Sequence, residues 1–230
     1  DKLIYLLLQV LPQGFFSLIG RNPDDASRYE FKSIELKETA FRIDGVFVPT
    51  DDDVTYFVEA QFQTDEQFYA RFFAEIFLYL KQYPTANWQA VVIYPSRSVE
   101  QKQIKPYSEF LALACVKRVY LDELSESESN TVALFELLIA KEEEAGARAE
   151  RLAQKASMVE LNLIEQILSY KFKTLTREEI RKMLKIQEEL GLKDTAFYKE
   201  AFEEGKLEGR EEGRLATVPL LRELGLRDEV

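Results

Sequence analysis

The segment FRIDGVFVPTDDDVTYFVEAQFQ, residues 41–63, reads as two short strands joined by a turn. Both strands are rich in Phe, Val, Ile and Tyr, which favour a pleated sheet, and the Pro-Thr-Asp-Asp-Asp sequence between them is typical of a turn. An acid nevertheless stands in the middle of each strand, Asp44 in the first and Glu59 in the second, and Gln61 follows two residues later. The pattern predicts an antiparallel hairpin with an acidic face.

The spacing of the apolar residues predicts how the two acids lie in this hairpin. Regular alternation puts Asp44 on one face of its strand with Val46 and puts Ile43 on the other face. Matching apolar face to apolar face then places Asp44 opposite Glu59 or nearly so, with Gln61 on the same side. Like charges that face each other destabilise a sheet, so this arrangement calls for a compensating positive charge.

A divalent cation is the simplest compensation for such a pair. Mg²⁺ is typically held by one or two protein carboxylates together with water and substrate phosphate, and Gln61 can hydrogen-bond to a water molecule there. An alternative reading pairs Asp44 with Arg42 or Arg71 and leaves Glu59 at a solvated edge of the sheet. Spacing alone leaves both readings open.

The composition excludes several kinds of catalytic site. The 230 residues include no histidine, which excludes Ser-His-Asp and Cys-His catalysis and histidine-based zinc sites. The single cysteine, Cys115, excludes an internal disulfide and fits a reducing cytoplasm. Catalysis by this chain is therefore expected to use carboxylates and a hard metal ion.

Charge and hydropathy limit the kinds of partner. The net charge is −11, but residues 1–120 hold 13 Lys and Arg against 16 Asp and Glu, whereas residues 121–230 hold 17 against 25. The first half is thus close to neutral, which leaves nucleic-acid binding open there. The longest apolar run near the start, LIYLLLQVL, has about half the length of a membrane-spanning helix, so no membrane partner is expected. The run lacks a basic leading segment and a small-residue cleavage site, so it is not expected to be a secretory signal.

The order of the expected elements describes an α/β fold. The hairpin is followed by a long apolar helix that suits a crossover to a buried strand, which gives a mixed sheet flanked by helices. The expected elements are a helix over 2–19 broken at Pro12, strands over 29–36, 41–48 and 54–63, a helix over 65–83 capped at Thr64 or Asp65, strands over 88–96 and 116–124, and only helices from about 126, among them one that begins with a Thr176–Glu179 capping box.

Several of these segments together resemble a known family. The motif RIDGVF…YFVEAQFQ resembles the D…(D/E)-x-K motif of PD-(D/E)XK nucleases, in the variant in which Gln replaces the final Lys. The longer segments FKSIELKETAFRIDGVFVP, YFVEAQFQTDEQFYARFFAEIFLYLKQY, WQAVVIYPSRSVE and KRVYLDEL resemble an uncharacterised, mainly cyanobacterial subfamily of the recombination-promoting nucleases, a transposase-like group. The resemblance covers about residues 1–145 and implies a restriction-endonuclease-like sheet.

The resemblance also implies a reaction and roles for individual residues. It implies hydrolysis of a DNA phosphodiester by metal-activated water, with Asp44 and Glu59 as ligands of Mg²⁺ or Mn²⁺ and Gln61 in the position of the lysine. The further upstream acid of related nucleases is assigned to Glu38, with Glu35 as the weaker candidate.

Positive charge for a phosphate must come from elsewhere, because a neutral amide stabilises developing charge less than a lysine does. Arg71 is one candidate, and a pairing of Arg71 with Glu75 at i+4 is an equally open alternative. A nearby segment carries cations that are further candidates for phosphate contacts, with Lys102 and Lys105 as the first choices: Arg97, Lys102, Lys105, Lys117 and Arg118.

The sequence divides into an expected nuclease-like core over 1–125 and a helical extension over 126–230. The extension ends in a Gly-, Arg- and Glu-rich tail, whose Gly205, Gly209 and Gly213 are four residues apart and suit self-association as a dimer. The expected function is a cytoplasmic Mg²⁺-dependent DNA endonuclease. The alternative is a catalytically weak or inactive nuclease fold that acts as a binding or assembly module through its helical tail.

Overall fold

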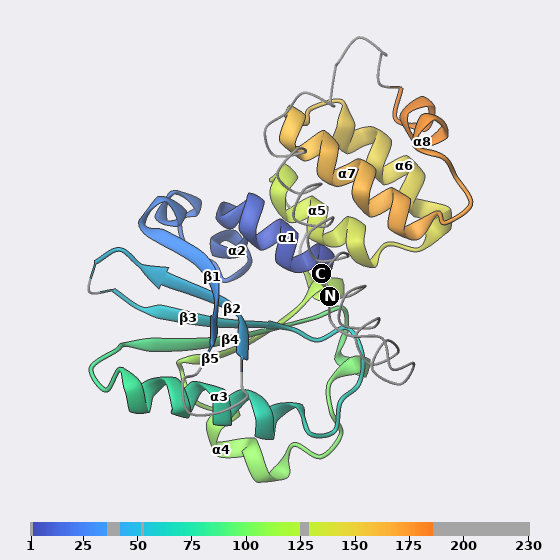
Figure 1. Ribbon diagram of the computed structural model, residues 1–230. Coiled ribbons are helices and arrows are strands. Elements are labelled where there is room, and N and C mark those ends of the chain that lie inside the picture. Colours follow the sequence, from blue (N-terminus) through green and yellow to red (C-terminus); the bar gives the residue numbers. More distant parts are fainter. Residues whose placement is uncertain (1, 36–41, 52, 125–128, 186–230) are drawn as a thin grey trace, which may run out of the picture. The chain divides into compact units, whose positions relative to one another are not determined.

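The computed structural model describes residues 2–35, 42–51, 53–124 and 129–185 (Figure 1). These residues belong to one compact unit, Asp1–Lys185. The predictions for Glu38 and for the glycines of the tail therefore lie outside the described residues. The predicted boundary at residue 125 stays a prediction.

The described elements follow the predicted order. The helices are α1 (Lys2–Val10), α2 (Pro12–Leu18), α3 (Phe68–Gln82), α4 (Ser108–Leu111), α5 (Asn130–Ile139), α6 (Glu142–Ala153), α7 (Met158–Lys171) and α8 (Arg177–Met183). The strands are β1 (Tyr29–Glu35), β2 (Arg42–Pro49), β3 (Thr55–Ala60), β4 (Trp88–Tyr94) and β5 (Val116–Tyr120). Short 3₁₀ helices are η1 (Pro23–Arg28), η2 (Arg97–Val99), η3 (Lys105–Tyr107) and η4 (Leu121–Glu123).

The five strands form one mixed sheet in the order β1-β2-β3-β4-β5. Strands β1, β2 and β3 are antiparallel neighbours, whereas β3, β4 and β5 run parallel to one another. Helix α3 makes the crossover from β3 to β4 and covers one face of the sheet, while α1 and α2 lie against the other face (Figure 1). The predicted mixed α/β sheet flanked by helices is confirmed.

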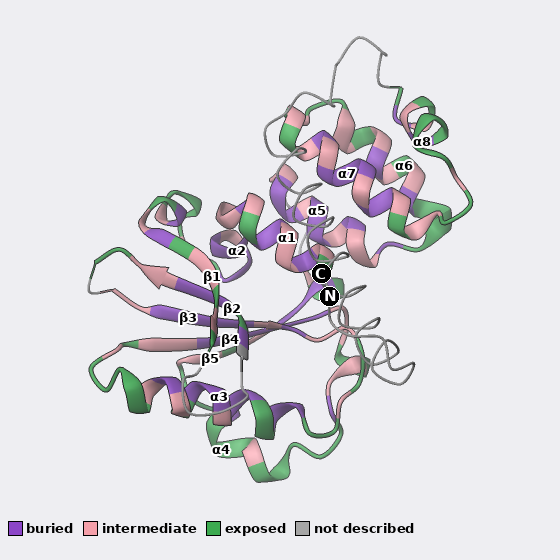
Figure 2. Cartoon of the chain, viewed as in Figure 1, coloured by how far each residue is buried: buried purple, intermediate pink, exposed green. Residues whose placement is uncertain are grey.

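Two apolar layers hold the helices to the sheet, and most of the strand residues are buried (Figure 2). On the side of α2, the ring of Phe15 stacks on Phe47 with their centroids 4.4 Å apart. On the side of α3, Phe72 and Ile76 belong to a buried cluster with Phe57 of β3. Each layer buries several aromatic rings, which contribute strongly to stability because of their large apolar area.

A β-bulge in β2 changes the predicted face of one residue. Between the β1–β2 pairs Lys32–Val46 and Ile34–Ile43, β2 contains one residue more than β1, so the extra residue lies at Asp44–Gly45. Ile43 and Val46 therefore both join the cluster under α3, although regular alternation puts them on opposite faces. The predicted alternation is wrong at this point because a bulge reverses the order of faces within one strand.

The boundaries of β3 and α3 also differ from the prediction. Strand β3 ends at Ala60, although the Gln61 N–H still donates to the Ile93 carbonyl at 2.9 Å. Helix α3 begins at Phe68, and Asp65, one of the two predicted caps, accepts a hydrogen bond from the Gln67 N–H at 2.9 Å just before it. The Gln101 side chain accepts a hydrogen bond from the Tyr69 N–H at 3.0 Å. A residue 32 positions away thus satisfies a free N–H of the first turn, which local sequence cannot reveal.

Residues 129–185 contain only helices, as predicted. The capping box of Thr176 and Glu179 opens α8, and a second one, formed by Ser157 and Glu160, opens α7. Among the helices that the structure describes, none is both long and apolar enough to cross a bilayer.

The bulge generates a prediction about Gly45. A Cβ atom at this position would lie 2.4 Å from the Val58 carbonyl oxygen and 3.0 Å from Cε1 of Tyr5. We expect Gly45→Ala to lower the free energy of unfolding by about 1–3 kcal/mol, because backbone has to move to accept the methyl group. Urea unfolding followed by the fluorescence of Trp88, the single tryptophan, measures the change.

Gly146→Ala is the matched control for this substitution. Its Cβ would meet the Met183 sulfur at 3.2 Å, at the flexible end of a side chain, and alanine is the better helix former in α6. We expect no loss of stability for Gly146→Ala. Equal stability of both variants would contradict the close approach at Gly45.

Candidate functional site

Asp44 lies in β2 and Glu59 lies in the neighbouring strand β3, near the carboxyl end of β3. Val46 of β2 pairs with Phe57 of β3, and Gly45 of the bulge approaches the Val58 carbonyl, so Asp44 and Glu59 are the next residues along the two strands. Asp44 is exposed, and the side chain of Glu59 is 18% exposed. Ligand sites in α/β proteins commonly form beyond the carboxyl ends of parallel strands, and β3 and β4 are such a pair.

Arg71 of α3 lies among three carboxylates. Its guanidinium is 3.0 Å from Asp65, 3.9 Å from Glu59 and 4.0 Å from Glu75. The side chain is still 43% exposed, so solvent reaches it. The pairing of Arg71 with Glu75 at i+4 is confirmed, and it occurs together with the contact to Glu59. A phosphate contact by Arg71 stays a prediction.

Glu75 is the third carboxylate near Arg71. The sequence identified it only as an i+4 partner of Arg71. Its side chain is 8% exposed, because α3 turns this position toward the sheet. Burial raises the pKa of Glu75 to about 7, Arg71 opposes this shift, and the charge of Asp44 adds to it. A charged residue on the buried face of an otherwise apolar helix is the signal that could have identified it.

The pKa of Glu59 is raised in the same way as that of Glu75. Burial raises the pKa of Glu59 to about 7, and the charges of Glu75 and Asp44 add to the rise. A hydrogen bond from Tyr5 and the charge of Arg71 act in the opposite direction. Asp44 thus raises the pKa values of both Glu59 and Glu75, and the three acids form an acidic cluster in which added positive charge is stabilising.

Tyr5 reaches the cluster from the opposite face of the sheet. Its hydroxyl donates to Oε2 of Glu59 at 3.1 Å. Burial and the neighbouring charge of Glu59 raise the pKa of Tyr5, so that the hydroxyl stays protonated and remains a donor. Tyr5 stands within the apolar stretch LIYLLLQVL, where it resembles a core aromatic, and the sequence did not single it out.

Gln61 lies just beyond the end of β3. Its side-chain amide donates to the backbone carbonyl of Gln63. This contact uses one of the two N–H donors of the side-chain amide within its own loop. The predicted role of Gln61 at a water molecule stays a prediction.

The cations of residues 97–118 divide into two sets. Three of them have partners within the fold: Arg97 pairs with Glu123, Arg118 with Glu100 at 3.0 Å, and Lys117 donates to the Ile19 carbonyl at 2.6 Å. Lys102 and Lys105 are exposed. Phosphate contacts by these two lysines stay a prediction.

Glu100 fixes the loop that carries them. Burial opposes its charge, but hydrogen bonds from Tyr69, Tyr120 and Arg118 outweigh burial and lower the pKa of Glu100 below its ordinary value. Because Tyr69 belongs to the first turn of α3, this network ties the loop to the helix that carries Arg71.

The oxygen ligands of the cluster fit a hard divalent cation. Among the residues that the structure describes, no group of three or more Cys, Asp or Glu side chains has the geometry of a metal site. Mg²⁺ needs only one or two protein carboxylates, since water and phosphate complete its coordination. Asp44 and Glu59 supply that number, and the guanidinium of Arg71 shows that a positive charge is accommodated beside Glu59.

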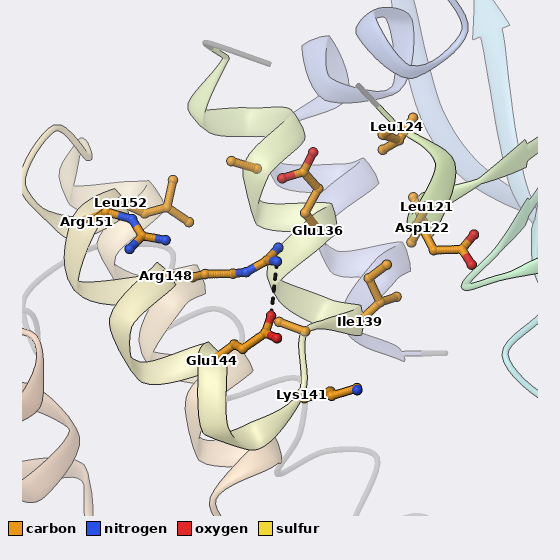
Figure 3. Close-up of a pocket in the computed structure, with 12 residues that line it drawn as sticks. Leu121, Asp122, Leu124, Glu136, Ile139, Lys141, Glu144, Arg148, Arg151 and Leu152 are labelled. Atoms are coloured by element: carbon orange, nitrogen blue, oxygen red, sulfur yellow. Dashed lines mark hydrogen bonds and ion pairs between the residues drawn. The ribbon is translucent and has the colours of Figure 1, made fainter. Parts of the chain in front are cut away.

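A separate cavity of about 540 Å³ lies between η4, α5 and α6 (Figure 3). Its charged lining contains three cations, Lys141, Arg148 and Arg151, and three acids, Asp122, Glu136 and Glu144. Arg148 and Glu144 form an ion pair at 3.1 Å. The balanced charges favour no ligand class, so the acidic cluster is the stronger candidate site.

The raised pKa of Glu75 predicts a pH-dependent stability. A carboxyl that titrates at about 7 in the folded state and near 4.5 when unfolded destabilises the fold increasingly as the pH rises from 4.5 through 7. We expect Glu75→Gln to raise the free energy of unfolding at pH 8 by about 1–3 kcal/mol, and to raise it much less at pH 5. Urea unfolding at both pH values measures the difference.

Glu109→Gln in α4, where the acid is exposed, is the control and is expected to change stability little at either pH. An equal effect of Glu75→Gln at pH 5 and pH 8, or a loss of stability at pH 8, would contradict the raised pKa of Glu75 in the folded state.

Comparison with known proteins identifies a family for most of the chain. No curated protein and no solved structure matches it. A family model described as "Protein of unknown function (DUF2887)" matches residues 1–184, a range that includes the sheet, the acidic cluster and α5 to α8. The chain belongs to this DUF2887 family.

Proposed function

We propose that the protein is a cytoplasmic DNA endonuclease that depends on Mg²⁺ or Mn²⁺. The observation that supports the proposal is the close approach of β2 and β3 at Gly45 and Val58, the neighbours of Asp44 and Glu59, with Arg71 3.9 Å from Glu59. Two acids and a cation near the carboxyl end of β3, the central strand, match the needs of phosphodiester hydrolysis, in which a metal ion and a positive side chain offset the charge of the phosphate.

The topology supports a sheet of the PD-(D/E)XK type. An N-terminal helix precedes three antiparallel strands, and α3 then crosses to the parallel strand β4. The two acids lie on the second and third strands of this series, in the order that the resemblance of the sequence implies. The absence of histidine from the chain also favours metal-dependent hydrolysis.

Each side chain of the cluster would have a separate role in such a site. Asp44 and Glu59 would hold the ion, which supplies Lewis acidity and lowers the pKa of water. Arg71 is exposed enough to turn toward a phosphate oxygen and stabilise its negative charge. Glu75 would keep its ion pair with Arg71.

The DNA backbone would contact the protein along α3 and the loop that follows η2. Lys102 and Lys105 project from this loop, and the Lys102 N–H is 3.5 Å from the Glu66 carboxylate just before α3. Such contacts neutralise phosphates without reading the base sequence. A homodimer formed through the C-terminal tail remains part of the proposal.

A catalytically inactive nuclease fold that serves as a binding module is the second candidate. Two contacts favour it: the Gln61 amide is engaged by Gln63, and Arg71 is surrounded by carboxylates of its own chain. The two functions differ in one observable property, because only the enzyme turns over a DNA substrate.

The proposal predicts the effect of individual substitutions on DNA cleavage. We expect the protein to nick supercoiled plasmid with Mg²⁺ or Mn²⁺, and Asp44→Ala or Glu59→Ala to reduce nicking to background, because each removes a ligand of the ion. Gln61→Ala should lower the rate less than either acid variant does. Gln61→Lys should retain or raise it, because a lysine adds positive charge near the phosphate.

Agarose-gel assays with and without EDTA measure these rates, and Glu109→Ala is the control because this acid is exposed on α4. Absence of nicking under every metal condition, with the circular dichroism spectrum of a folded protein, would favour the binding module. Cleavage that survives Asp44→Ala would place the activity at a different site.

A further inference from the structure

Tyr5 is the one aromatic hydroxyl that the described structure brings into hydrogen-bonding contact with Glu59. It comes from α1, whose Ile4, Leu7 and Leu8 are buried against the rest of the core. This packing fixes the position of α1, so the hydroxyl is presented by a rigid element rather than by a loop. The O–H donates to Oε2 of Glu59 at 3.1 Å.

The ring of Tyr5 also contacts the strand that carries Asp44. A Cβ atom at Gly45 would lie 3.0 Å from Cε1 of Tyr5, so the ring packs directly on the backbone of the bulge. The Ala60 N–H points to the same hydroxyl at the longer distance of 3.4 Å. Tyr5 thus touches both strands of the candidate site, next to each of the two acids.

The two oxygens of Glu59 consequently have different surroundings. Oε2 accepts the hydrogen bond of Tyr5, whereas Oε1 lies 3.9 Å from the guanidinium of Arg71. A carboxylate held at one oxygen cannot rotate freely, and its other oxygen stays turned toward the cation. Partners of this kind orient metal ligands in proteins, and their loss commonly weakens metal binding 10- to 100-fold.

We infer that Tyr5 is a positioning residue that holds the Glu59 carboxylate by Oε2 and leaves Oε1 to bind a divalent cation. This inference rests on the proposed function, since it assumes that Glu59 is a ligand. It assigns α1 a role in the site. Neither the acidic motif nor the charge pattern of the sequence indicates this role. Tyr5 itself is not expected to touch the cation or the substrate.

Isothermal titration calorimetry with Mn²⁺ at pH 8 tests the inference without depending on cleavage. We expect Tyr5→Phe to raise the dissociation constant about 10-fold or more. Tyr170→Phe, at a tyrosine of α7 that is 68% exposed, is the control and should leave the constant unchanged. Phenylalanine retains the ring that packs on Gly45, and thermal unfolding of each variant confirms that the fold is kept.

A double-mutant cycle separates a positioning role from a general structural one. If Tyr5 acts through Glu59, then Tyr5→Phe added to Glu59→Gln should weaken Mn²⁺ binding no further than Glu59→Gln alone. Equal losses in both backgrounds would overturn the inference. A Tyr5→Phe variant that binds Mn²⁺ as tightly as the wild type would also overturn the inference.

The outcomes also distinguish this inference from the proposed function. Wild-type protein that binds no Mn²⁺ would overturn both. Wild-type protein that binds Mn²⁺ through Tyr5 and Glu59 but does not cleave DNA would overturn the nuclease and retain the positioning role. Cleavage and Mn²⁺ binding that are both unaffected by Tyr5→Phe would overturn the positioning role alone.

Discussion

The positive charge of Arg71 is the constraint on which the candidate site depends. Its guanidinium lies within 4.0 Å of Asp65, Glu59 and Glu75, so a single cation faces three carboxylates. Carboxylates that leave water must be paired or must take up protons, and burial raises the pKa values of Glu59 and Glu75 to about 7 although Arg71 opposes the shift. A further cation would stabilise the charged form of both carboxyls, and this is the physical argument for the proposed metal at Asp44 and Glu59.

Much of this arrangement follows from local patterns in the sequence. Alternating apolar residues on either side of a turn predict the hairpin, and a two-residue period leaves few registers that bury both apolar faces. That restriction predicts the pairing of Val46 with Phe57, whereas the bulge next to it breaks the alternation at Asp44. The crossover helix α3 and the buried strand β4 were also predictable, because one has a helical period and the other is an unbroken apolar run between turn residues.

The features that shape the site could not be predicted in the same way. The bulge at Asp44–Gly45 depends on the pairing of β2 with β1, and one extra residue leaves no mark in the apolar pattern. Glu75 looked like an ordinary i+4 partner of Arg71, because the sequence does not show how far α3 is turned toward the sheet. Tyr5 lies in an apolar helix, and its contact with Glu59 spans 54 positions of the chain. Each of these features comes from tertiary packing rather than from local preference.

The measurement that tests the central claim most directly is a crystal structure of the protein grown with Mn²⁺ and examined by anomalous scattering. The account predicts one anomalous peak between the carboxylates of Asp44 and Glu59, about 2.0–2.3 Å from an oxygen of each. Oε2 of Glu59 should still accept the hydrogen bond of Tyr5 in that structure. A map without a peak at this position in millimolar Mn²⁺, with Arg71 still between Glu59 and Glu75, would contradict the account.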